Sequence, residues 1–220
     1  MNTFTACRTF ARQPSVMIKA AMALSGVGLA LWLTLHMAGN LLWLLRPSVM
    51  DSYGSMLHGS GVLWPVRLLL VGGLVVHIGG AVLTTRRAHA ARPTHYRRLR
   101  SSASGLASRS MRWTGVAMLG FLLYHVASVY GIGHEHVSGA FHHNLSALLL
   151  SPWDALLLSM AAGLVAMHLG HGLASALVSL GMISAKHEAR LRKTMRLWDC
   201  IVTVGFLLPP VISWAQHLLA

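Results

Sequence analysis

Charged side chains are scarce in this chain. Only 10% of its 220 residues are Asp, Glu, Lys or Arg, while 55% are hydrophobic; a soluble globular domain is about one quarter charged. This deficit excludes water as the main solvent of the folded chain. Acidic residues are the rarest charged type, with five against 18 Lys and Arg, and the formal net charge is +13.

Cysteine is nearly absent as well. The chain has two cysteines, Cys7 and Cys200. A disulfide framework and a cysteine-ligated iron–sulfur cluster both need more, so neither is expected within this chain.

Five windows contain no charged residue: 20–45, 68–85, 113–134, 155–185 and 200–220. Each is about as long as a helix must be to cross roughly 30 Å of hydrocarbon. Inside a bilayer the backbone must satisfy its own hydrogen bonds, which requires helices. We therefore predict an all-α integral membrane protein of five transmembrane helices, forming one membrane domain over residues 1–220. The predicted helices span about 16–45, 64–85, 113–133, 153–184 and 198–218.

Basic residues alternate between the two sides of the predicted bundle. Sixteen of the 18 lie before the first charge-free window or in two basic loops, 86–112 and 185–197; Arg46 and Arg67 are the exceptions. By the positive-inside rule the N-terminus is cytoplasmic and the C-terminus outside. No basic-aromatic reading motif accompanies the charge, so we expect no nucleic-acid partner. Anionic headgroups of membrane lipid or a cytoplasmic protein are better matches.

Histidine is the ionisable residue that recurs in the apolar windows. Ionisable groups inside a membrane are functional candidates by default. The first four predicted helices supply them: His36, His77, His125, and the pair His168 and His171. At about 1.5 Å per residue, His36 and His125 lie in the outer half of the bilayer, and His77 lies in the inner half with His168 or His171. The pattern predicts two bis-histidine sites. Depth alone slightly prefers His171 as the partner of His77.

Bis-histidine ligation fills both axial positions of a haem iron and is typical of electron transfer. Gly39, Gly73, Gly80 and Gly172 lie three or four residues from these histidines, on the same helix faces. They leave room for a planar cofactor, or they allow close helix packing. Because no Asp or Glu lies in the windows, haem is favoured over a bare zinc or copper ion. Each histidine could otherwise be a neutral, hydrogen-bonded side chain.

Several motifs occur in a familiar order: LHMAGN with His36, VVHIGGA with His77, ASRSMRWTG at the start of helix three, YHV with His125, and MHLGHGLASALVSLG in helix four. Together they resemble the cytochrome b membrane-anchor subunit of succinate:quinone oxidoreductases, the succinate dehydrogenase and fumarate reductase family, in its single-chain, five-helix, two-haem form. The resemblance implies that His36 and His125 hold the outer haem and His77 and His168 the inner one. It selects His168 over His171, which becomes a haem neighbour or an alternative ligand.

The function implied by this resemblance is electron transfer to a membrane quinone, expected to be menaquinone, through two haem b groups. A flavoprotein subunit and an iron–sulfur subunit would dock on the cytoplasmic face of the bacterial inner membrane, and the chain itself would not oxidise succinate. A higher oligomer of the complex is compatible with the resemblance. Some fumarate reductases of the family carry a proton-transferring glutamate two residues before the helix-four ligand, where this chain has Ala166.

Further site residues are suggested by their residue type and position. His58, with Asp51 and Tyr53 nearby, is the candidate for the quinone site, although it could be an exposed loop residue. Arg112, together with Arg86, could bind inner haem propionates or simply extend to the interface. The outer cluster of His134, His136, His142 and His143 is expected to be solvated.

Two other functions fit the same pattern. The chain could be the dihaem cytochrome b anchor of another oxidoreductase, of the hydrogenase or formate dehydrogenase type. It could also be a transporter whose histidines relay protons without haem.

Overall fold

The computed structural model describes residues 15–91, 106–133, 136–182 and 185–219. Within these ranges all regular structure is helical. The elements in chain order are α2 (Ser15–Asn40), η1 (Leu41–Leu44), α3 (Pro47–Gly59), α4 (Leu63–Ala90), α5 (Leu106–Val129), α6 (Phe141–Leu150), α7 (Pro152–Ser179), η2 (Ala185–His187) and α8 (Glu188–Leu219).

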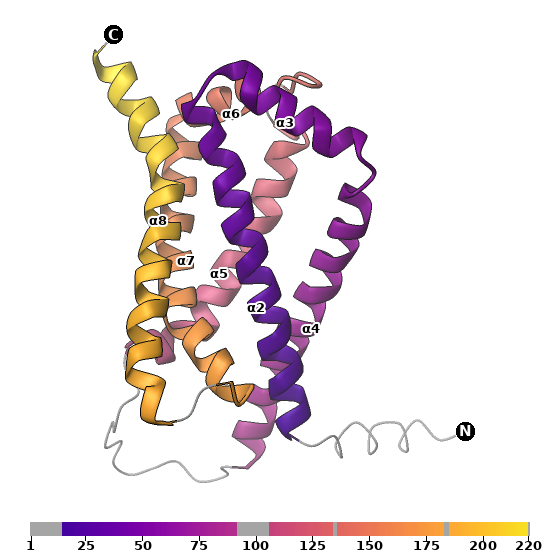
Figure 1. Ribbon diagram of the computed structural model, residues 1–220, viewed down its shortest axis with the longest axis vertical. Coiled ribbons are helices and arrows are strands. Elements are labelled where there is room, and N and C mark those ends of the chain that lie inside the picture. Colours follow the sequence, from indigo (N-terminus) through magenta and orange to yellow (C-terminus); the bar gives the residue numbers. More distant parts are fainter. Residues whose placement is uncertain (1–14, 92–105, 134–135, 183–184, 220) are drawn as a thin grey trace.

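The five longer helices run along a common axis, while the short helices α3 and α6 lie at one end of the bundle (Figure 1). Helix α2 packs along α4 and α7, and α7 packs in addition on α5 and α8. Small side chains are frequent among the buried residues of these helices: Ala23, Ala30, Ala161, Ala162 and Ala174. Small residues let helix backbones approach closely, which is how helices associate where no water drives them together.

Four segments are long and apolar enough to cross a membrane: Ser15–Leu44, Leu63–Ala90, Pro152–Ser179 and Glu188–Leu219. Helix α5 has 24 residues, carries Arg109 and Arg112 in its first turns, and packs on α7 within the same bundle. The fold is thus that of an all-helical membrane protein with four long apolar candidate spans.

The helices extend into the segments that we expected to be basic loops. Helix α4 continues to Ala90, α5 already begins at Leu106, and α8 begins at Glu188. The first turn of α8 is supported by an ion pair four residues apart, with 2.5 Å between Glu188 Oε1 and Arg192 Nη2. Helix α7 ends at Ser179, earlier than expected, because Gly181 adopts a positive φ of 70° just beyond it.

The end of the bundle formed by α3 and α6 is more structured than the sequence suggested, and α6 was not predicted. Trp43 Nε1 donates a hydrogen bond of 2.8 Å to Ser146 Oγ on α6. The His142 backbone N–H donates one of 2.8 Å to Asp51 Oδ1 on α3. These bonds join the connection after α2 to the connection before α7.

Two carboxyl groups lie inside the bundle, each one residue before a charge-free window and within a predicted helix. Asp154, in the first turn of α7, is 2% exposed and accepts a hydrogen bond from the Tyr124 hydroxyl on α5. Asp199, within α8, is 8% exposed, and its Oδ1 has no hydrogen-bond partner in the described part of the chain. The sequence placed both residues in helices, but the charge-free windows did not show that their carboxyl groups are buried.

Candidate functional site

The structure brings His36 of α2 and His125 of α5 together. Their ring centroids are 6.0 Å apart and the ring planes meet at 75°. Phe121, one turn before His125, stacks on it at 5.6 Å, and Phe206 of α8 lies 6.1 Å from His36. Aromatic rings therefore surround this pair on two sides.

The second pair is His77 of α4 and His168 of α7, with 6.3 Å between ring centroids and 67° between ring planes. His77 Nδ1 donates a hydrogen bond of 3.0 Å to the Met22 carbonyl of α2. His168 Nδ1 lies 3.1 Å from Thr114 Oγ1 of α5. The Thr114 hydroxyl can give its proton to the Ser110 or Met111 carbonyl and can then accept the proton of His168. In that arrangement both imidazoles use Nδ1 as a donor and keep Nε2 available.

The spacing within each pair suits one metal ion between two imidazoles. Two metal–imidazole bonds of about 2 Å, with about 1 Å more from each nitrogen to its ring centre, separate the ring centres by about 6 Å. Both observed distances, 6.0 Å and 6.3 Å, agree with this value. A partner on the second ring nitrogen, as seen for His77 and His168, fixes the tautomer and orientation of a ligating histidine. The residues present fit an axially ligated haem iron.

Asn40 distinguishes the outer pair from the inner one. Its Nδ2 donates a hydrogen bond of 3.2 Å to His36 Nε2, from the same face of α2 one turn further on. Ligation of a metal ion through His36 Nε2 therefore requires this hydrogen bond to be exchanged for the metal bond.

The glycines whose added Cβ would meet a histidine ring differ from the four glycines that lie near the histidines in the sequence. A Cβ atom on Gly39 or Gly80 would meet Tyr53 or Met22, which indicates close helix packing. A Cβ on Gly26 would lie 2.9 Å from His77 Cε1, and one on Gly115 would lie 3.4 Å from His168 Cε1. Gly26 and Gly115 belong to α2 and α5, so no spacing within the histidines' own helices could have identified them.

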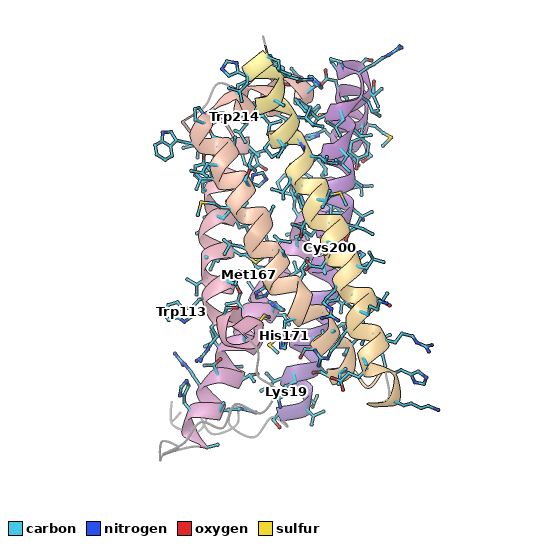
Figure 2. The ribbon with its side chains drawn as sticks, turned by 90° about the vertical axis from the view of Figure 1, so that its left-hand side faces the viewer. Lys19, Trp113, Met167, His171, Cys200 and Trp214 are labelled. Carbon is cyan, nitrogen blue, oxygen red and sulfur yellow. The ribbon has the colours of Figure 1, made fainter. Side chains whose placement is uncertain are left out.

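His171 does not pair with His77. It is half-buried on α7, and Figure 2 places it low in the bundle, below Met167 and above Lys19. Arg112 donates a hydrogen bond of 3.3 Å to His89 Nε2 near the end of α4.

His58, the quinone-site candidate, belongs to helix α3 instead of an irregular loop. Its Nδ1 donates a hydrogen bond of 2.9 Å to the Gly54 carbonyl, and its ring lies 4.9 Å from that of Phe141. Asp51 binds the backbone of His142, and Tyr53 lies against Gly39. These three residues therefore have separate neighbours at the same end of the bundle.

The outer histidine cluster is dispersed. His134 lies outside the described residues, His142 stacks on Trp43 at 5.9 Å, and Asn144 Nδ2 donates a 3.4 Å hydrogen bond to His136. Nowhere in the described ranges do three or more His, Cys, Asp or Glu side chains gather closely enough to hold a metal ion.

The sequence model of one protein family, described as the succinate dehydrogenase/fumarate reductase transmembrane subunit, matches residues 86–208. The chain belongs to this family. It is a membrane anchor subunit of succinate dehydrogenase/fumarate reductase and a multi-pass membrane protein of respiratory complex II. Comparisons with curated proteins and with solved structures give no match.

The family has two consequences for the anchor subunit. Its members associate with the other subunits of complex II, and they commonly bind haem b. The matched region contains His125 and His168, one member of each pair, while His36 and His77 precede it. Of the three functions considered from the sequence, family membership supports the anchor of complex II.

Proposed function

We propose that this anchor subunit holds two haem b groups, one between His36 and His125 and one between His77 and His168, and connects the iron–sulfur subunit with membrane quinone. The observation that carries the proposal is the two imidazole pairs at 6.0 Å and 6.3 Å. Each pair joins two helices and has the spacing that one axially ligated metal ion requires.

The haem groups, when bound, supply one-electron carriage. The chain's own residues orient and shield them. The Met22 carbonyl and the Thr114 hydroxyl hold the inner imidazoles with Nε2 available, and Phe121 and Phe206 keep water from the outer pair. A haem iron held by both histidines of a pair would have no open coordination position, so each site would be suited to electron transfer and not to binding oxygen or succinate.

The proposal includes five spans, with α5 as the third. Helix α5 supplies His125, and it supports the inner site through Thr114. The proposed orientation places the end with the basic helix termini on the cytoplasmic side, where the flavoprotein and iron–sulfur subunits would dock. The end with α3 and α6 then faces outward.

For the quinone, we retain His58 as the proposed proton donor near the outer end, with menaquinone as the expected substrate. His58 already uses Nδ1 to bind the Gly54 carbonyl, which leaves Nε2 as the group that can exchange a proton with a ligand.

The first prediction concerns cofactor content. The purified complex is expected to contain two b-type haems per anchor subunit, counted by pyridine haemochrome analysis, and reduced-minus-oxidised spectra should show low-spin bands. Succinate should reduce these haems when the flavoprotein and iron–sulfur subunits are present. A folded, colourless complex would contradict the proposal, and so would haems that exchange no electrons with succinate or fumarate.

The second prediction concerns Thr114. Thr114→Val keeps the side-chain shape but removes the acceptor for His168 Nδ1, and loss of such a partner typically weakens metal binding about 10–100-fold. Haem should be lost from the inner site first when the complex is titrated with apomyoglobin. Thr34→Val is the matched control, because within the described part of the chain the Thr34 hydroxyl bonds only to the Ala30 carbonyl of its own helix. Equal haem retention in both variants would show that Thr114 does not hold the ligand.

A further inference from the structure

A groove of about 200 Å³ lies between the first turns of α2 and the last turns of α4. Each helix contributes three residues with the same spacing: Ser15, Ile18 and Lys19 from α2, and Thr84, Arg87 and Ala88 from α4. Residues three and four apart share a helix face. The groove is therefore lined by one face of α2 and one face of α4.

The lining of this groove is divided by chemistry. Lys19 and Arg87 supply two positive charges, Ser15 and Thr84 supply two hydroxyl groups, and Ile18 and Ala88 are apolar. Among the residues that the structure describes, no acidic side chain lines the groove. Hydroxyls and basic groups together bind a phosphate well, while the apolar residues match the hydrocarbon that adjoins the headgroup of a lipid.

The position of the groove also points to lipid. Figure 2 shows Lys19 at the lower end of the bundle, and Val16 and Met17, beside the groove on α2, are 70% and 60% exposed. At the boundary between acyl chains and headgroups, apolar side chains can contact the acyl chains while cations contact the headgroups. Basic pockets between membrane helices bind anionic headgroups in this way.

We propose that the groove between α2 and α4 is a binding site for one anionic phospholipid, with the phosphate held by Lys19, Arg87, Ser15 and Thr84. The acyl chains leave along the exposed apolar surface of α2. This assignment needs only that the bundle lies in a membrane, and it is independent of haem ligation.

The first test uses the complete complex, including its partner subunits, reconstituted with spin-labelled phosphatidylglycerol or phosphatidylcholine. Electron paramagnetic resonance measures the fraction of each lipid that is immobilised by the protein. We expect stronger association of phosphatidylglycerol than of phosphatidylcholine, and equal association would overturn the proposal. Because this measurement uses the unaltered chain, it remains decisive if variants fail to assemble.

The second test compares K19Q/R87Q with K186Q/R190Q. The control pair removes the same charge near the start of α8, where Lys186 and Arg190 are exposed and do not line the groove. Two basic groups that contact the headgroup of one lipid change its association by about 30-fold in total. We expect that loss in the first variant and the unaltered selectivity in the control. Equal losses would show that only the overall charge matters.

Two alternative ligands give distinct results. If inorganic phosphate, at an ionic strength matched with chloride, displaces the labelled lipid, the site recognises free phosphate and the lipid assignment is wrong. If K19Q/R87Q alters the haem spectrum while lipid selectivity is kept, the two cations serve a haem propionate instead.

Discussion

His168→Ala is expected to remove one haem of two, because it deletes one axial ligand of the inner pair while the outer pair keeps both of its own. His77 would then face the space that the His168 imidazole occupies in the unaltered chain, where the two ring centres are 6.3 Å apart. The inner site would lack its second ligand. Pyridine haemochrome analysis should therefore fall from two haems per subunit to one. The residual spectrum should be that of the outer site.

His171→Ala is the matched control, since it removes an imidazole from the same helix less than one turn away. It is expected to retain both haems, because the ring that meets His77 belongs to His168. The reverse outcome, with one haem lost in His171→Ala and two kept in His168→Ala, would show that the ligand of helix α7 is misassigned.

Gly26→Ala is expected to have the second largest effect. The added Cβ atom would lie 2.9 Å from His77 Cε1 and 3.0 Å from Nδ1. The ring would have to move and give up its hydrogen bond to the Met22 carbonyl. We expect inner-haem affinity to fall by at least as much as the loss of a ligand's hydrogen-bond partner causes, about 10–100-fold.

Gly28→Ala isolates the steric effect from helix propensity. Gly28 lies two residues along the same helix, and no atom of the described residues lies within 4 Å of the position of an added Cβ there. Both variants gain the same helix stability, so only Gly26→Ala should lose inner haem in a haem-transfer titration to apomyoglobin. Equal retention would indicate that the bound state places His77 away from Gly26.

Much of the fold could be predicted because charge-free length is itself the physical requirement for crossing a bilayer. The membrane location and the family are confirmed, whereas the fifth span and the orientation stay predictions. The ends of the helices could be predicted less well. Nothing in the segment from Arg86 to Ala90 stops a helix, so α4 simply continues through it, and charge marks where a membrane ends, not where a helix does.

The candidate site shows the same division. The pairing of His36 with His125 was predicted from their similar depth in the membrane. For the inner pair, depth slightly preferred His171, and the family resemblance selected His168. The surroundings could not be predicted. Met22, Gly26 and Thr114 act on histidines of other helices, and contacts between helices have no local sequence period.

The two histidine pairs also determine how the bundle is braced. Three pairs of helices pack closely: α2 with α4, α5 with α7, and α2 with α7. The pairs α2 with α5 and α4 with α7 are not among the main packing pairs of the described residues. The histidine pairs connect those two diagonals. A group bound at either pair is thus a cross-brace, and by linkage its binding free energy adds to the stability of the assembled helices. Haem binding and helix assembly are then coupled, so we expect a lower melting temperature for the His168→Ala complex than for the unaltered complex.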